Sequence, residues 1–303
     1  MKGKVMLVMS LFASPLALAE QNAFSVNKEP DEWRFDVAWT DAGGRDRQVE
    51  YSLPTDAVES DLAVPLRFQV RDANAELVQV INDYGNATKG VQISAVQRGK
   101  KVAISGRARS RNALKKAKVG LKSVQRRAER RYLKAHGFTK LRGRIIPNHA
   151  QHAHRYAERV EPLALALGSG ELKRRAFAKR AVSFVQSIPY EQGRNGRDKG
   201  FRLPLSVLAR NKGDCDSKAT LYLALMKAAH PSLDSVFVYI KGHAFVGLGL
   251  RPAAKDVTFR ADGRTWVLVE PVGPALSPIG QGARRSERKA RRGAFDVRRV
   301  KDD

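Results

Sequence analysis

Residues 212–227 read Lys-Gly-Asp-Cys-Asp-Ser-Lys-Ala-Thr-Leu-Tyr-Leu-Ala-Leu-Met-Lys and contain the only cysteine of the 303-residue chain, Cys215. Gly213 permits a sharp turn and Asp214 is a good N-cap acceptor, so the pattern predicts a helix that begins at the cysteine. The positive end of a helix dipole favours a thiolate over a thiol. The residues that follow are apolar nearly all round, which predicts a buried helix with only its N-terminal end near a surface. Cys215 is therefore either a nucleophile or a small core residue.

Two downstream segments favour the nucleophile. His243 lies in Lys-Gly-His-Ala-Phe-Val-Gly-Leu at 241–248, and Glu270 lies in Trp-Val-Leu-Val-Glu-Pro at 266–271. Residues 235–240, 243–250 and 265–270 read as antiparallel strands, with a turn at 261–264. The order is thus a thiol at a helix start, an imidazole on a strand and a carboxylate at the end of the next strand. A nucleophile, a base and a group that orients the base are the three parts of a catalytic triad.

These segments resemble the transglutaminase-like cysteine hydrolase superfamily, which includes bacterial periplasmic transglutaminase-like cysteine proteinases. The matching pieces are Gly-Asp-Cys-Asp at 213–216, His-Ala-Phe-Val at 243–246 and Trp-x-x-x-Glu-Pro at 266–271, within a resemblance that covers about residues 170–275. The resemblance implies an α+β fold with a papain-like or transglutaminase-like core, in which a buried helix packs against an antiparallel sheet. It implies a triad of Cys215, His243 and Glu270. The activity implied is that of a cysteine peptidase or amidase, which cleaves peptide or amide bonds through a thioester.

The chain departs from this family in two places. The third triad member is most often Asp in the family, whereas here it is Glu270, and Asp262 in a turn is a weaker substitute. The calcium-dependent members carry acidic residues around the cysteine, and Asp214 and Asp216 match two of them, but Ser217 stands where another acid is usual. Thiol hydrolysis requires no cofactor. Calcium at Asp214 and Asp216 is therefore an additional hypothesis, and the alternative for Asp214 is an N-cap role.

The first 19 residues have the anatomy of a secretory signal peptide. Lys2 and Lys4 precede an apolar run at 5–18, and Ala-Leu-Ala at 17–19 suits a cleavage site. No later segment approaches the ~20 apolar residues of a membrane-spanning helix. The sequence therefore predicts a periplasmic or secreted protein without a transmembrane segment.

The rest of the chain divides into four predicted parts. Residues 20–110 read as a β-rich N-terminal domain, with strands at 33–39, 49–53, 62–70, 76–83, 91–97 and 101–105. Residues 111–160 form a basic helical connector whose helix at 111–135 has apolar residues at three- and four-residue steps. Residues 161–279 are the transglutaminase-like catalytic domain, and 280–303 are a basic tail, disordered or loosely helical.

The connector ends in a cluster of His149, His152 and His154. On a helix only His149 and His152 share a face, and no nearby cysteine or carboxylate completes a metal-binding set. The cluster therefore predicts a solvated helix start.

Positive charge is concentrated in two segments. The chain has a formal charge of +26, and residues 98–144 hold 18 Lys and Arg against one acid, while residues 284–301 hold nine against two. Such segments attract acidic partners: an acidic polypeptide or peptide-bearing substrate, or anionic envelope polymers. They also leave two alternatives to the hydrolase, a non-catalytic polyanion- or cell-envelope-binding protein and a protein cross-linking acyltransferase. Nucleic acid is disfavoured as a partner by the predicted export.

Overall fold

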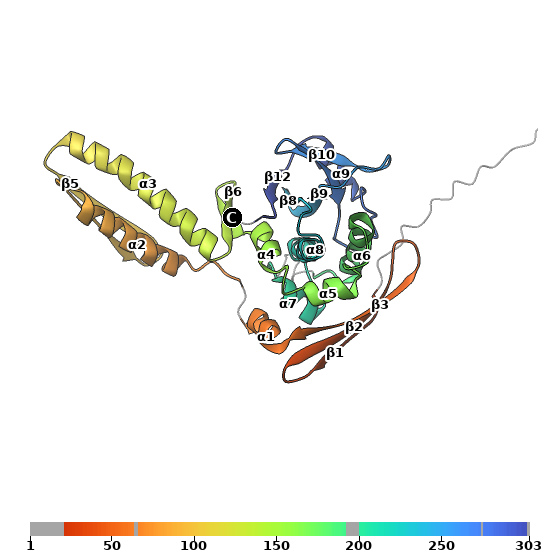
Figure 1. Cartoon of the computed structure of the whole chain (residues 1–303). Helices are drawn as coiled ribbons and strands as arrows, with labels where there is room; N and C mark the ends of the chain where they lie inside the picture. Colours follow the sequence, from red (N-terminus) through yellow and green to blue (C-terminus); the bar gives the residue numbers. More distant parts are fainter. Residues whose placement is uncertain (1–20, 64–65, 192–199, 274, 302–303) are drawn as a thin grey trace, which may run out of the picture.

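The computed structural model describes residues 21–63, 66–191, 200–273 and 275–301, so the predicted signal peptide lies outside the described residues. Helices and antiparallel strands are mixed along the chain, and the fold is α+β. In Figure 1 a body that contains most of the elements carries a long arm, which points away from it. None of the helices in the described ranges is both long and apolar enough to cross a membrane.

A five-stranded antiparallel sheet forms the centre of the body, in the order β10-β11-β9-β8-β12. Its central strands are rich in Val and Phe, which pack well on a pleated surface buried on both faces. The predicted strands at 235–240, 243–250 and 265–270 are confirmed as β8, β9 and β11. The bounds are β8 (Ser235–Ile240), β9 (His243–Leu248), β10 (Thr258–Ala261), β11 (Arg264–Val269) and β12 (Asp296–Arg299).

One face of this sheet packs against α8 (Cys215–Ala229), whose first eleven residues are almost all buried. The predicted helix that begins at the cysteine is confirmed, and so is its cap, because the Asp214 carboxylate accepts a hydrogen bond from the Ser217 backbone N–H at 2.9 Å. Four shorter helices surround α8 and bury its remaining sides. They are α4 (His149–Arg155), α5 (Glu161–Ala166), α6 (Arg174–Ser187) and α7 (Pro204–Arg210).

The opposite face of the sheet is covered by α9 (Arg284–Arg291), whose Ala290 packs in one apolar cluster with Phe245 and Trp266. After α9 the chain forms β12, which pairs with β8 along the edge of the sheet. The expectation of a disordered or loosely helical tail at 280–303 is therefore corrected. Its few apolar residues, such as Ala290 and Val297, show no local periodicity and gain a role only against the sheet.

A three-stranded sheet in the order β1-β2-β3 packs against α6 and belongs to the body. Trp39 of β2 is fully buried, its indole N–H donates to Ser183 Oγ at 3.1 Å, and its ring packs edge to face on Phe184. The predicted strands at 33–39 and 49–53 are confirmed, but they do not form a domain with residues 91–110. The elements are β1 (Gln21–Lys28), β2 (Glu32–Thr40) and β3 (Asp46–Pro54), followed by α1 (Thr55–Ala63).

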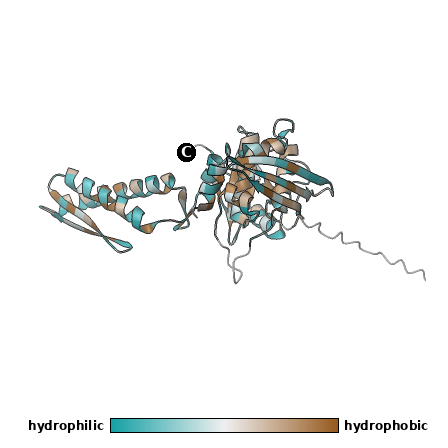
Figure 2. Cartoon of the chain, turned by 90° about the horizontal axis from the view of Figure 1, so that it is seen from below, coloured by the Kyte–Doolittle hydropathy of each residue, from teal (hydrophilic) through white to brown (hydrophobic). Residues whose placement is uncertain are grey.

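The arm is a separate unit with its own apolar cluster, to which Ile81, Ile93 and Leu121 contribute. Figures 1 and 2 both show it extending from the body, and in Figure 2 hydrophilic and hydrophobic segments alternate along it. The predicted helix at 111–135 and strands at 91–97 and 101–105 are confirmed. The arm consists of α2 (Val70–Ala87), β4 (Val91–Arg98), β5 (Lys101–Ala108) and α3 (Arg111–Ala135).

The predicted strands at 62–70 and 76–83 are wrong, because α1 ends at Ala63 and residues 70–87 form α2. Leu77, Ile81 and Gly85 follow one another at four-residue steps and face the arm's cluster, and this spacing outweighs the strand propensity of the neighbouring valines. Gly85 is required for the close packing, since a Cβ there would lie 2.2 Å from the Ile93 carbonyl oxygen. A short hairpin of β6 (Phe138–Leu141) and β7 (Arg144–Pro147) then joins α3 to α4.

Candidate active site

His243 and Glu270 meet at one end of the central sheet. His243 is the first residue of β9 and Glu270 directly follows β11, the antiparallel neighbour of β9. The ring Nε2 of His243 lies 3.0 Å from Oε1 of Glu270, whose side chain is only 3% exposed. Because an ionised carboxylate can only accept, Nε2 carries the proton of this hydrogen bond. In the neutral ring, Nδ1 is then the atom that can accept a proton.

The second oxygen of Glu270 is held by the C-terminal segment. The hydroxyl of Ser286 on α9 is fully buried and donates to Oε2 at 2.7 Å. Gly282 lets this segment approach, since a Cβ there would lie 2.8 Å from Leu268 Cδ2 and 3.4 Å from Glu270 Cβ. Sequence reasoning missed Ser286, because it lies within a run of basic residues and shows no local signal of burial.

The pKa of His243 is raised, although burial by itself lowers it. The hydrogen bond from Nε2 to Glu270 and the charge of Glu270 stabilise the imidazolium, and the charge of Asp216 adds to them. Arg285, which donates to the Lys241 carbonyl nearby, acts in the opposite direction. The site therefore favours a protonated ring up to a higher pH than an ordinary histidine would.

Cys215 stands at the first position of α8 and is 7% exposed. Its Sγ donates to the carboxylate of Asp216 at 3.4 Å, and between described residues the thiol makes no hydrogen bond with His243. Alternation along β9 gives His243 the strand face of Phe245, toward α9, whereas α8 packs on the opposite face of the sheet, against Ala244 and Val246. The structure thus joins His243 and Glu270 directly, and the charge of Asp216 links them to the Cys215 end of α8.

A second histidine lies beside Asp216, the residue that follows Cys215. The ring of His149 is 2% exposed, stacks on Phe237 with the ring centroids 4.6 Å apart, and places Nδ1 3.0 Å from the hydroxyl of Tyr239. Its Nε2 lies 3.7 Å from Asp216 Oδ2. Burial lowers the pKa of His149 to about 3, so the ring is neutral near pH 7.

The expectation of a solvated helix start at these histidines is therefore wrong. His152 is also buried, and its Nε2 donates to the Gly137 carbonyl at 2.9 Å. Asn148 does cap the helix, through a hydrogen bond from the Gln151 backbone N–H. The contacts that bury His149 come from residues about 90 positions away, which a local pattern cannot reveal.

A buried brace connects the cysteine helix to the backbone of Glu270. Lys218, one turn after Cys215, is fully buried and donates from Nζ to the carbonyls of Ile188 at 2.6 Å and Gln186 at 3.2 Å. Burial lowers the pKa of Lys218 to about 7. The amide of Gln186 donates in turn to the Glu270 carbonyl at 2.7 Å. Lys218 and Gln186 are therefore positioning groups that link α8, the end of α6 and the segment after β11.

Calcium binding at Asp214 and Asp216 stays a prediction. Asp214 caps α8 and Asp216 contacts Cys215, whereas calcium takes six to eight oxygen ligands. In the described parts of the chain, no group of three or more His, Cys, Asp and Glu side chains is arranged to hold a metal ion. The N-cap role of Asp214, the alternative weighed from the sequence, is the one that the hydrogen bond to Ser217 establishes.

Comparison of the chain with models of known families, with curated proteins and with solved structures found no match.

Proposed function

We propose that this protein is an exported, thiol-dependent hydrolase of peptide or amide bonds, with Cys215 as nucleophile, His243 as base and Glu270 as the group that orients the base. The observation that carries the proposal is the pair formed by His243 and the buried Glu270 carboxylate, beside a helix that begins with the chain's only cysteine. A purely structural helix start would not require an oriented imidazole whose pKa is raised by Glu270 and by the charge of Asp216, the residue next to Cys215. The packing of α8 on the antiparallel sheet also supports the prediction of a transglutaminase-like core.

In the proposed reaction Nδ1 of His243 takes the proton of the Cys215 thiol, and the thiolate attacks the carbonyl carbon of the substrate. The imidazolium then gives its proton to the leaving nitrogen, so that an amine departs and a thioester remains. Water attacks the thioester while His243 takes its proton, and the carboxylic acid leaves as the thiol is restored. Glu270 keeps Nε2 protonated throughout. An amine in place of water would give acyl transfer by the same steps.

The Cys215 thiol is expected to react with iodoacetamide at pH 5–6 faster than a model thiol, whose pKa is about 8.5. The physical reason is the imidazolium, whose raised pKa lets it stabilise a thiolate over this range. The measurement is the alkylation rate of the mature chain as a function of pH, followed by mass spectrometry. In His243→Ala the rate should fall to that of an ordinary thiol.

His136→Ala is the matched control, because this exposed histidine lies at the end of α3, outside the site. Its alkylation profile should equal that of the wild type. A wild-type profile that follows the model thiol, or one that His243→Ala leaves unchanged, would exclude the activated pair.

Ser286→Ala should lower kcat/KM by about tenfold, the typical range for loss of one hydrogen bond to a charged group. The substitution leaves Oε2 of Glu270 without its donor, while Oε1 still accepts the hydrogen bond from His243 Nε2. The loss should appear in kcat and not in KM, because Ser286 contacts the carboxylate and not the substrate. Ser277→Ala is the control, since the hydrogen bond of Ser277 to Gln186 uses its backbone carbonyl; equal effects of the two substitutions would contradict this role for Ser286.

A further inference from the structure

The arm, residues 70–135, carries 17 Lys and Arg against four Asp and Glu. All ten of the Lys and Arg side chains on α3 are exposed. Within the described part of the chain, only Arg131 among these ten pairs with a carboxylate, that of Glu76 at 3.1 Å. Because like charges at close spacing repel one another, an anionic partner would relieve a repulsion that the arm does not neutralise itself.

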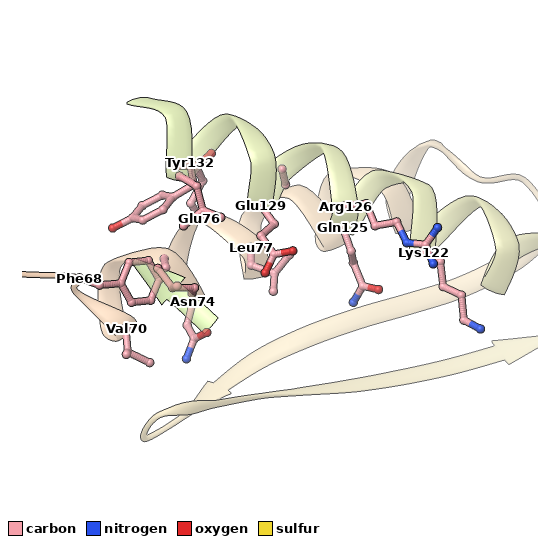
Figure 3. A pocket seen from close by; sticks show the side chains of 14 residues that line it. Phe68, Val70, Asn74, Glu76, Leu77, Lys122, Gln125, Arg126, Glu129 and Tyr132 are labelled. Carbon is pink, nitrogen blue, oxygen red and sulfur yellow. The ribbon is translucent and has the colours of Figure 1, made fainter. Parts of the chain in front are cut away.

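A groove of about 620 Å³ lies between α2 and α3 where the arm joins the body (Figure 3). One end is lined by apolar side chains, among them Phe68, Val70 and Tyr132, and the other end by Lys122 and Arg126. An apolar surface next to two cations is suited to a chain in which an apolar side chain is followed by anionic groups.

The carboxylates in this groove do not cancel its positive end. Glu76 pairs with Arg131, and Glu129 pairs with Lys140 at 2.5 Å. Asn74 adds a donor, since its Nδ2 is buried and has no hydrogen-bond partner among the described residues. A carbonyl oxygen of a bound peptide backbone would satisfy that donor.

The shape of the apolar end favours a polypeptide over other polyanions. Phe68 packs edge to face on Tyr132 and on Phe138, and Tyr132 stacks on His136, so these rings do not present a free flat face on which a nucleic-acid base could stack. The apolar side chains line a groove, whereas insertion into a membrane surface requires them on an outward face.

The groove is connected to the candidate active site by a short stretch of chain. The β6–β7 hairpin begins six residues after Tyr132 and is tied to β12 by an ion pair between Arg142 and Asp296 at 2.8 Å. It leads directly into α4, whose first residue is His149, beside Asp216 at the start of the cysteine helix.

We propose that this groove docks an acidic segment of a polypeptide and so presents that polypeptide to Cys215. The segment places an apolar side chain against Phe68, Val70 and Tyr132, and its carboxylates contact Lys122 and Arg126. The docking of substrate rests on the hydrolase function proposed above, whereas binding of the segment does not.

The test measures the dissociation constant of a fluorescent 12-residue peptide, in which Leu-Phe is followed by four Glu, by anisotropy with the mature chain carrying Cys215→Ser. Added Lys122→Glu/Arg126→Glu should weaken binding by about tenfold or more, since the charge partners are reversed. The control is Lys115→Glu/Lys118→Glu, which changes the net charge by the same amount but on the exposed face of α3 outside the groove. It should weaken binding less than about threefold, because only screened long-range electrostatic effects are lost. Replacing Leu-Phe by Ser-Ser in the peptide should also weaken binding.

Equal losses in the two double variants would overturn the proposal, because they would show a diffuse charge effect. The proposal would also be overturned if duplex DNA or phosphatidylglycerol vesicles bound more tightly than the peptide and this binding depended on Lys122 and Arg126. Hydrolysis of a short amide without an acidic segment reports on the active site alone. Peptide binding without hydrolysis of the short amide would support the docking groove and contradict the hydrolase function. Hydrolysis of the short amide without peptide binding would support the hydrolase function and contradict the docking groove.

Discussion

Cys215→Ser is expected to abolish hydrolysis of any amide substrate, with a fall in kcat of about 10⁴-fold or more. The hydroxyl is far less acidic than the thiol, so His243 cannot hold it as an anion, and no thioester forms. The side chain is nearly isosteric, and the Asp214 cap on Ser217 does not involve it. The measurement is turnover of an amide substrate by the mature chain under single-turnover conditions.

The fold must be shown to survive this change. Cys215→Ser should keep the wild-type melting temperature and circular dichroism, because the substituted atom lies at the start of α8 and outside its apolar packing. Turnover that persists in the serine variant would assign the reaction to another group. A chain that hydrolyses no amide substrate in either form would contradict the assignment of Cys215 as a nucleophile.

Glu270→Gln is expected to lower kcat/KM by about 10²–10⁴-fold, the range found for loss of an oriented acid–base partner. The amide removes the charge that raises the pKa of His243 and replaces the carboxylate with a weaker, neutral acceptor, while the burial that lowers this pKa remains. The pKa of His243 should therefore fall. Since the imidazolium must give its proton to the leaving nitrogen, the alkaline limb of the kcat/KM profile should move to lower pH.

Asp262→Asn is the matched control for this experiment. Asp262 is the alternative carboxylate in the turn between β10 and β11, and its backbone φ of 49° lies in a region that Asn adopts readily. Its side chain lies 3.7 Å from Arg299 and has no contact with His243 among the described residues. Both the rate and the pH profile should match those of the wild type. A Glu270→Gln profile with an unshifted alkaline limb would contradict the assigned role of the carboxylate.

Short-range patterns gave the elements that carry the candidate residues. The start of α8 could be placed at Cys215 because Gly213, Asp214 and the apolar run that follows all indicate the same boundary. The apolar stretches at 235–240, 243–250 and 265–270 likewise indicated three strands, and the three- and four-residue steps of 111–135 indicated α3. In each case the residues that carry the sequence pattern are the same residues that form the helix or strand.

The same reasoning failed where a residue's surroundings come from elsewhere in the chain. Residues 70–87 contain β-branched side chains typical of strands. They form a helix because Leu77, Ile81 and Gly85, at four-residue steps, lie on one helix face, and this face is buried by residues of β4 and α3. Trp39 lies on a strand of the predicted β-rich N-terminal domain, but Ser183 and Phe184, about 145 residues later, bury it.

The sequence by itself determined that a lone thiol begins a buried helix and that a histidine and a carboxylate follow on neighbouring strands, because caps and side-chain periodicity are properties of adjacent residues. Only the tertiary structure decided that Glu270 contacts His243 and Ser286, that His149 is buried beside Asp216, and that the basic segments form an arm and a cover over the sheet. The contacts of Glu270 and of His149 join residues 16 to 67 positions apart. They depend on how strands pair and helices pack, and neither is encoded in any single stretch of the chain.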